Sequence, residues 1–489
     1  MDITFIGHNA MYFGTVGGLL IDPVLEKKYG DDYTSSPVEI YPPRDVDYET
    51  LPAPSAIVIS HEHSDHFQIA SLSKLSRDAT VYVGPLMPDA VRELVTALGF
   101  GLIEAEFGRP YEAGDVLFQL YPAGRQTALW ESRVSQIYVR DLGDPEFGGA
   151  FITVDALPSE MFVEDVRAGS IPPPVLLGCS NNAQVTPAGV YGSTDNMQNE
   201  RTFEGAGQRS AIPGADIVGS LFDDVIAEFP EFAQSNLLLT GGGFLKDYEE
   251  MGPFPLSDQD EIASAVSDLV DSIQVLGPRP GDRFRVETGQ LTTLDEPAKW
   301  VRLDTSRWVE LQSRRDAFLG SGGFIPMKAI LQAVDAVDVD RVIADVESDF
   351  LYLERLLLTS SLARELLTAS AERGRAEDVV LFRLLNGKDT YDWSFDLAAS
   401  KFLRVDEKIG RNTLHHYPFG IVAHLSDWHA VITGRFQIWD IVGVAMRAWF
   451  PEGYGSSPVI CLYNGYGEQA RPEIAYQVYR EQLSKVVVQ

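Results

Sequence analysis

The first 155 residues alternate short apolar runs with segments in which apolar residues recur at helical spacing. Residues 2–22 predict two strands, because glycines in this stretch permit tight turns. Further strands are predicted at 56–59, 80–83, 101–106, 116–121, 134–139 and 150–154, with a helix at 89–98. This alternation is typical of layered structure, so we expect two sheets with helices outside them.

The pattern changes after about residue 255. Apolar residues at helical spacing predict an amphipathic helix over Asp258–Leu276, which leads into the breaker Gly-Pro-Arg-Pro-Gly at 277–281. A domain boundary is therefore expected between about residues 251 and 281. We predict two domains, 1–255 and 256–489.

The second domain is predicted to be a mixed, largely helical α+β unit. Its expected helices are 328–346, 350–368, 426–434, capped by Ser426, and 438–450, and its expected strands are 391–403 and 412–423. Residues 390–489 weakly resemble a sterol-carrier-type C-terminal domain. No chemical motif accompanies that likeness.

Composition limits the partners of the chain. It has 489 residues, 45% of them hydrophobic, and a formal net charge of −32. Nucleic acid is not an expected partner, because neutralising phosphates requires surplus Lys and Arg, and the same acidity disfavours anionic membranes. No leader pattern or membrane-spanning apolar run is evident, so a cytoplasmic location is expected. The expected partner is a small-molecule substrate, and self-association into a homo-oligomer is left open.

The densest chemical motif is H-x-H-x-D-H at residues 61–66, directly after the apolar run 56–59. Four consecutive apolar residues predict a buried strand that ends where its side chains become polar. Because strand side chains have a period of two, His61 and His63 can point the same way and hold one cation. The Asp-His pair that follows can face a second position. Imidazole and carboxylate ligands suit zinc, iron or manganese.

This motif resembles that of the metallo-β-lactamase-fold superfamily, in which H-x-H-x-D-H supplies ligands to both metals of a two-metal site. The opening segments 3–9 and 17–23, with Gly7-His8 and an Ile-Asp-Pro ending, are similar to the opening hairpin of that family. The most similar branch includes lactonase-like members and the metallo-β-lactamase part of the sialic-acid hydroxylases. The likeness covers about 1–252 and implies an αββα sandwich. In the lactonase-like branch a Gly-His here lies near the metal pocket, although His8 could instead bond within its turn.

The resemblance implies an incomplete ligand set for this chain. The implied metal ligands are His61, His63, Asp65, His66 and Asp155, the last of which matches the position of the family's metal-bridging aspartate.

Two family histidines have no counterpart here. The turn that normally carries the next histidine reads Tyr-Pro-Ala-Gly-Arg-Gln-Thr, with Arg125 at its fifth position. A guanidinium cannot ligate a cation, but it can bind a carboxylate or phosphate, so Arg125 is a predicted anion anchor. Glu131, Cys179 or Asn181 could substitute as ligands, although a buried cysteine behaving as a small hydrophobe is the favoured interpretation of Cys179.

The sequence therefore predicts a metal-dependent hydrolase of a small anionic organic substrate, cleaving an ester, lactone or related bond. Asp65, Asp155 and Arg125 are the expected catalytic residues. Zn²⁺ is the expected metal, in one or two copies, with iron or manganese as alternatives. Two further functions stay open: an iron-dependent oxygenase or hydroxylase on the same fold, and a catalytically inactive binding or scaffold protein. Two cysteines are too few for an iron–sulfur electron-transfer module.

Overall fold

A computed structural model describes most of the chain, in segments. These are residues 1–29, 38–63, 65–125, 127, 133–180, 190–191, 225–241, 243–245, 259–269, 274–320, 327–359, 362–374, 376–405, 409, 414, 416–436, 438–441 and 445–449, with isolated residues between 471 and 484. Their strands form two large sheets, a third sheet of six strands and two small sheets. Within these segments, no helix is both long enough and apolar enough to cross a membrane.

The first large sheet contains the strand that leads into the histidine motif. Its order is β20 (Gln290–Leu294), β19 (Arg283–Glu287), β1 (Asp2–Gly7), β2 (Ala10–Phe13), β3 (Leu19–Ile21), β7 (Ala56–Ile59), β8 (Thr80–Val83) and β9 (Gly101–Glu104). Strands β3, β7, β8 and β9 run parallel. In β7, Ile57 and Ile59 pack with apolar residues of helices α1 (Ile69–Lys74) and α2 (Asp89–Ala97), whereas Val58 packs toward the second sheet. Burial on both faces explains why this strand is continuously apolar.

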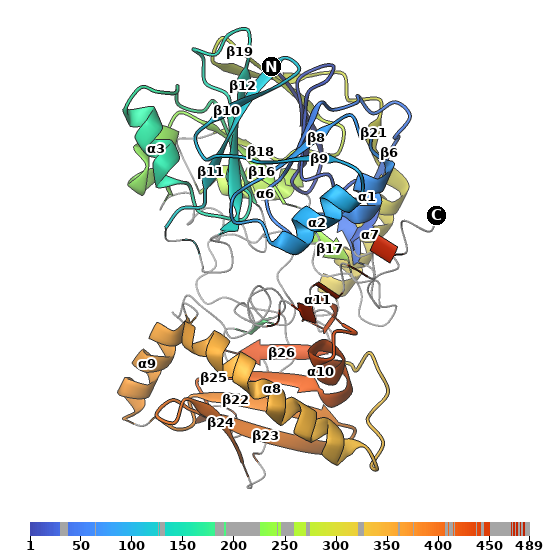
Figure 1. The fold of residues 1–489 in the computed structure, drawn as a ribbon, viewed down its shortest axis with the longest axis vertical. Coiled ribbons are helices and arrows are strands. Elements are labelled where there is room, and N and C mark those ends of the chain that lie inside the picture. Colours follow the sequence, from blue (N-terminus) through green and yellow to red (C-terminus); the bar gives the residue numbers. More distant parts are fainter. Residues whose placement is uncertain are drawn as a thin grey trace.

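The second large sheet faces the first. Its order is β10 (Pro110–Ala113), β11 (Val116–Pro122), β12 (Ser135–Asp141), β13 (Ala150–Ile152), β14 (Leu176–Ser180), β16 (Asn236–Thr240) and β18 (Val275–Leu276). Helices α3 (Glu160–Arg167) and α6 (Gln259–Ser267) cover its outer face, where the ring of Phe162 stacks on Phe151 at 3.8 Å between centroids. Between the sheets, apolar side chains from both form one cluster. The layers are helix, sheet, sheet and helix (Figure 1), which confirms the expected αββα sandwich.

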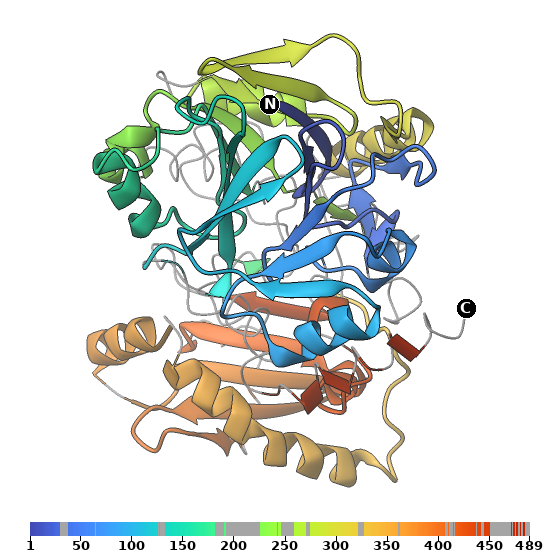
Figure 2. The same cartoon turned by 45° about the horizontal axis from the view of Figure 1, so that its top comes forward.

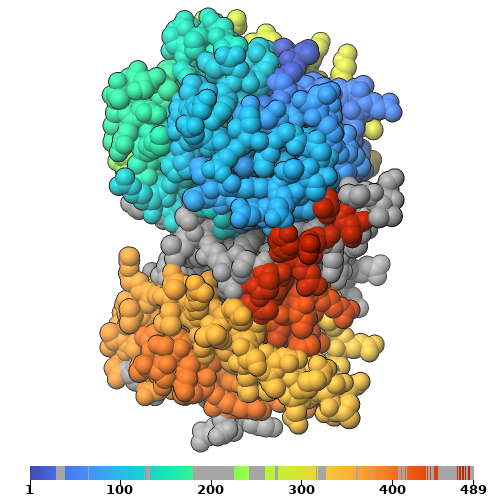
Figure 3. Space-filling model, in the orientation of Figure 1, coloured from blue at the N-terminus to red at the C-terminus, as the bar shows by residue number. Residues whose placement is uncertain are grey.

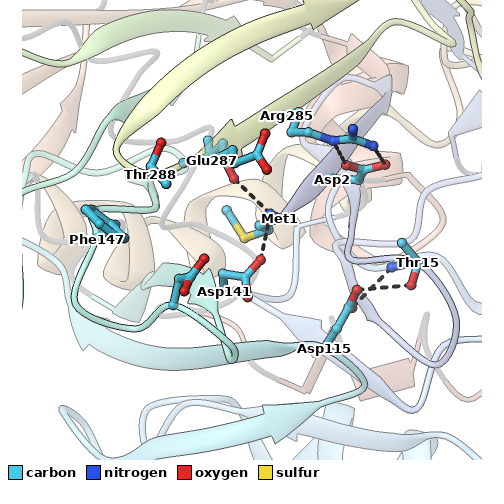
Figure 4. A pocket seen from close by; sticks show the side chains of 12 residues that line it. Met1, Asp2, Thr15, Asp115, Asp141, Phe147, Arg285, Glu287 and Thr288 are labelled. Carbon is cyan, nitrogen blue, oxygen red and sulfur yellow. Dashed lines mark hydrogen bonds and ion pairs between the residues drawn. The ribbon is translucent and has the colours of Figure 1, made fainter.

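The two-sheet unit extends well past residue 255. Strand β18 joins the second sheet, and β19 and β20 join the first. The amino group of Met1 donates to the Val286 carbonyl at 2.8 Å and to Asp141 Oδ2 at 2.7 Å, beside a pocket at this edge of the sheets (Figure 4). The boundary predicted between 255 and 256 therefore falls inside the sandwich. The helix predicted for 258–276 ends at Ser267, because the chain then supplies the edge strand β18.

Two small sheets and one helix complete this unit. Strand β21 (Val301–Leu303) pairs with β6 (Arg44–Val46), and β17 (Gly243–Leu245), β5 (Val38–Tyr41) and β4 (Lys28–Tyr29) form a three-stranded sheet. Helix α7 (Thr305–Gly320) is tied to β5 by an ion pair between Arg307 and Glu39 at 2.8 Å. This ion pair joins α7 to the first unit.

The second unit is built on the third sheet. Its order is β15 (Val190–Tyr191), β26 (Met446–Trp449), β25 (Phe419–His424), β22 (Val380–Asn386), β23 (Asp389–Asp396) and β24 (Lys401–Arg404). Helices α8 (Val339–Thr359), α9 (Leu362–Arg373) and α10 (Leu425–Ile432) contribute to an apolar cluster with one face of the sheet (Figure 2). Figure 3 shows this unit in orange below the first, with the described C-terminal residues in red against both. Tyr476 accordingly donates to Glu93 of α2 at 2.5 Å.

Several elements predicted for the second half are wrong in part. Residues 328–338 are not helical, because the Asp427 carboxylate accepts the backbone N–H groups of Ile330 and Leu331 at 2.9 and 2.8 Å. The helix predicted over 438–450 is only α11 (Ile438–Ile441), after which β26 pairs antiparallel with β25. Pairing inside a sheet here outweighs local helix propensity. The helix predicted from Ser426 begins one residue earlier, at Leu425.

Candidate metal centre

The centre lies at the carboxyl end of β7, between parallel neighbours, where open sheets commonly place their ligands. Asp22, which directly follows β3, fixes the start of the histidine motif. One of its carboxylate oxygens accepts the backbone N–H of Ser60 and the other accepts the Ser60 hydroxyl, each at 2.7 Å. Asp22 and Ser60 are buried, so this anchor is shielded from competing water.

His61, His63 and Asp155 form the first group of metal-ligand atoms. His61 Nε2 lies 2.9 Å from His63 Nδ1 and 3.6 Å from Asp155 Oδ2. Both imidazoles are buried, and Asp155 is mostly buried. The predicted alternation of His61 and His63 thus brings two nitrogens together beside a carboxylate.

His8, Asp65 and His66 form the second group. His8 Nε2 lies 3.1 Å from Asp65 Oδ2, and His66 Nε2 lies 3.6 Å from the same oxygen. All three side chains are buried. His8 stands in the turn between β1 and β2 and its ring points at Asp65, which favours the metal-pocket interpretation over a bond confined to the turn.

Asp155 lies between the two groups. Its Oδ2 atom is 3.0 Å from His66 Nε2 as well as 3.6 Å from His61 Nε2. A single carboxylate oxygen therefore lies near ligand atoms of both groups. The preceding Val154 has a φ of +56°, an unusual value for a β-branched residue. Strain of this kind is characteristic of functional sites.

A second contact of Asp22 orients His66. His66 Nδ1 donates to Asp22 Oδ2 at 2.8 Å, so Nε2 is directed toward Asp65 and Asp155. Metal-binding histidines commonly use their other ring nitrogen in this way.

The electrostatics of the centre favour a cation among its carboxylates. Burial alone would lower the pKa of His66, but the carboxylates of Asp155, Asp65 and Asp22 outweigh it and hold that pKa well above its usual value. Burial would raise the pKa of Asp65, yet His66 and His8 keep it below the ordinary range. The pKa of Asp155 is lowered for a similar reason, chiefly by His66 against burial. The proton on His66 thus compensates charges that a metal ion would also compensate.

His61 behaves in the opposite way. Burial is the main cause that lowers its pKa well below the usual value, and the positive groups of His66, His63 and Arg133 act in the same direction. A neutral imidazole is the form that binds metals.

Arg133 is a residue of the centre that the sequence interpretation missed. Its Nη2 atom lies 3.0 Å from His63 Nε2, and its guanidinium forms an ion pair with the buried Glu62. It precedes β12 and lies 70 residues from His63 along the chain, so no local spacing indicates it.

The two ligand groups contain neither the predicted anion anchor nor a predicted substitute ligand. Arg125 has an exposed side chain, and its backbone N–H donates to the Glu160 carboxylate at 3.0 Å. Cys179 is a buried free thiol in the apolar cluster outside the second sheet, where burial raises its pKa to about 12. Glu131 and Asn181 lie outside the described residues.

The donor set fits metal ions. In each group the three candidate ligand atoms lie within 4.8 Å of one another. Among the described residues, Asp65 Oδ1 is buried without a hydrogen-bond partner, which is costly unless a cation or water satisfies it. Each group offers two imidazoles and one carboxylate, ligands used by zinc and by non-haem iron.

Comparison with known proteins gives remote structural likenesses. No protein-family model matches the chain, and no curated protein matches its sequence. Among solved structures, it is similar to the isothiocyanate hydrolase from Delia radicum gut bacteria, with 14% sequence identity and a TM-score of 0.37. The match covers 58% of this chain and 99% of that chain. A possible metal-dependent hydrolase from Veillonella parvula has 12% identity over the same shares, also at 0.37. The diiron β-hydroxylase CmlA from Streptomyces venezuelae has 14% identity over 60% of this chain and 54% of its own, at 0.35. Identities and TM-scores this low support no inference about function.

Proposed function

We propose that the chain is a metal-dependent hydrolase of a small anionic organic substrate, cleaving an ester, lactone or related bond. The observation that carries the proposal is the pair of buried two-histidine, one-carboxylate groups with Asp155 between them. His61, His63 and Asp155 would hold one ion, and His8, Asp65 and His66 the other. Zinc bound there would supply a Lewis acid and lower the pKa of water, the chemistry that hydrolysis at neutral pH requires.

The chain's own residues support this chemistry through position and charge. Asp22 accepts hydrogen bonds from both Ser60 and His66, which keeps the ligands of the two groups in a fixed relation. The lowered pKa values of Asp65 and Asp155 keep both carboxylates ionised near neutral pH. Asp65 Oδ1, which has no hydrogen-bond partner among the described residues, is available to contact a cation or a bound water.

The anionic substrate is proposed from the loop between β11 and β12. This loop carries Arg125 at its start and Arg133 at its end, and Arg133 reaches the centre. The exposed guanidinium of Arg125 is therefore a candidate to bind a carboxylate or phosphate of the substrate.

An iron-dependent oxygenase is the second candidate. The observation that favours it is the ligand type, because two histidines and one carboxylate with open positions are characteristic of non-haem Fe(II) oxygenases.

Metal analysis of freshly purified protein tests the proposal. Zinc together with hydrolysis of an ester or lactone panel, lost on chelation and restored by zinc, is the expected result. Iron with oxygen consumption and no hydrolysis would favour the oxygenase. Protein that retains no metal after incubation with zinc, iron or manganese would leave the binding or scaffold function.

A further inference from the structure

The first group of ligand atoms has a buried guanidinium beside it, that of Arg133. Its side chain is only 11% exposed, and it contacts both Glu62 and His63. A guanidinium carries donors only, so at 3.0 Å His63 Nε2 must be the acceptor. Arg133 thereby uses the lone pair of His63 Nε2.

That contact determines the tautomers of the first group. With Nε2 accepting, the proton of a neutral His63 is on Nδ1, which donates to His61 Nε2 at 2.9 Å. His61 in turn has its proton on Nδ1, which faces Ser60 Oγ at 3.0 Å, and Ser60 donates to Asp22. The hydrogen bonds run in one direction from Arg133 to Asp22. Both imidazoles of the first group are therefore already engaged through the nitrogens that face each other.

In the second group, the ring nitrogen of His66 that faces the other candidate ligands is not the one that donates to Asp22. Asp22 accepts the Nδ1 proton of His66, so the Nε2 nitrogen of that ring faces the carboxylates of Asp65 and Asp155. The neutral Asn9 amide lies 3.5 Å from the same nitrogen, and it carries no charge that would repel a cation. Because Nδ1 already donates to Asp22, a cation can bind Nε2 there without any change of tautomer. The surrounding carboxylates favour the cation as well.

We infer that Arg133 makes the two metal positions unequal: His8, Asp65 and His66 hold a divalent cation tightly, and His61 and His63 hold a second one weakly. This inference rests on the metal centre of the proposed function. Binding at His61 and His63 requires His63 Nδ1 to lose its proton to Nε2, and Nε2–H then faces the donors of Arg133. The guanidinium must move away, and its positive charge also repels the incoming ion. Partners in contact with metal ligands change affinity by roughly 10- to 100-fold, and we expect a difference of that order between the positions.

Zinc titration of the chelator-treated, full-length protein tests the inference. Tightly bound zinc is counted by elemental analysis after gel filtration, and dissociation constants are measured by calorimetry. The wild type should retain one equivalent tightly and bind a second one roughly 10- to 100-fold more weakly. Arg133→Gln, which removes the charge, should retain two. Arg125→Gln is the matched control, because Arg125 has an exposed side chain on the same loop, and it should retain one.

Ligand substitutions in the wild-type background give a second test that does not depend on the folding of Arg133→Gln. His63→Ala should keep the tight equivalent, whereas His66→Ala should lose it. Two tight equivalents in the wild type, or loss of the tight equivalent in His63→Ala with retention in His66→Ala, would overturn the inference.

The outcomes separate the inference from the proposed function. Unequal zinc binding without hydrolysis would support the inference and contradict the hydrolase. Two equally tightly bound zinc ions together with chelator-sensitive hydrolysis would support the hydrolase and contradict the inference. No zinc binding in any variant would contradict both.

Discussion

Buried charges are arranged differently in the metal centre and in the third-sheet unit. In the third sheet, Arg383 Nε and Nη2 donate to the two oxygens of Asp392 at 2.7 and 2.8 Å, a bidentate pair between adjacent strands. In the metal centre, one Asp155 oxygen lies near two imidazoles, and no residue in the described part of the chain hydrogen-bonds to Asp65 Oδ1. A charge matched by one dedicated partner serves the fold. Several carboxylate oxygens and imidazole nitrogens that face one another, with some of their hydrogen-bond acceptor sites unused, indicate a site for a cation.

Asp155→Asn should have the largest effect, because it removes the charge between both groups. We expect hydrolytic activity to fall by roughly 10²- to 10⁴-fold, the range of a lost acid–base or ligand function. The rise in melting temperature produced by added zinc should also shrink, since part of the binding energy is lost.

Chelated Asp155→Asn protein should be less stable than chelated wild type. The lowered pKa of Asp155 means that its ionised form stabilises the fold above its unfolded pKa, and that this stability is lost as pH falls. A stabilised mutant would show instead that the carboxylates repel one another. Asp165→Asn is the control and should leave activity unchanged. It alters a carboxylate that accepts a hydrogen bond from the Tyr121 hydroxyl at 3.0 Å.

Asp392→Ala tests the other side of the comparison. It leaves Arg383 buried without its carboxylate, so the free energy of unfolding should fall by about 3–5 kcal/mol. Zinc content should not change, because the pair serves the third sheet. Denaturant unfolding and elemental analysis of the same sample check both statements, and zinc loss in a folded mutant would contradict the separation.

Local pattern predicted much of the sandwich and part of the centre. The apolar run 56–59 followed by H-x-H-x-D-H predicted β7 and the side of His61 and His63, because strand period and burial are local properties. Asp155 was predicted from the family resemblance, and in the structure it closely follows β13 with its Oδ2 atom 3.0 Å from His66 Nε2.

Long-range contacts account for what the sequence did not predict. Asp65 is 57 residues from His8, and Glu62 is 71 residues from Arg133, so chain packing alone decides that they meet. Arg125 drew attention because of its place after a strand, whereas the guanidinium in contact with the histidines belongs to the other end of that loop. In the second half, 446–449 joins β25 although its local sequence favoured a helix, because partners in the sheet outweigh propensity.

Asp22→Asn should weaken the metal centre without removing a ligand. Its carboxylate accepts the Ser60 N–H and hydroxyl and the His66 Nδ1 proton, so the amide loses acceptor capacity on one side and presents donors to donors. We expect zinc affinity to fall by roughly 10- to 100-fold while the ligands themselves remain. Calorimetric titration measures this. Unchanged affinity would mean that Asp22 contributes only to folding.

The smallest expected effect is the pH dependence contributed by His424 at the end of β25. Burial, reinforced by Arg447, lowers its pKa to about 4, and its buried Nε2 atom has no hydrogen-bond partner in the segments that the structure describes. A folded pKa below the unfolded value of about 6.5 means that the stability is fully present above pH 6.5 and is lost as pH falls toward 4. Because the ring is partly exposed, we expect the free energy of unfolding to fall by only ~1 kcal/mol across this window.

Urea unfolding between pH 7.5 and 4.5 should therefore show a shallower decline in the free energy of unfolding for His424→Gln than for the wild type. His429→Gln, whose ring pairs with Asp345 at 3.0 Å, is the control. Equal slopes for wild type and His424→Gln would show that His424 protonates as readily in the folded protein as in the unfolded chain.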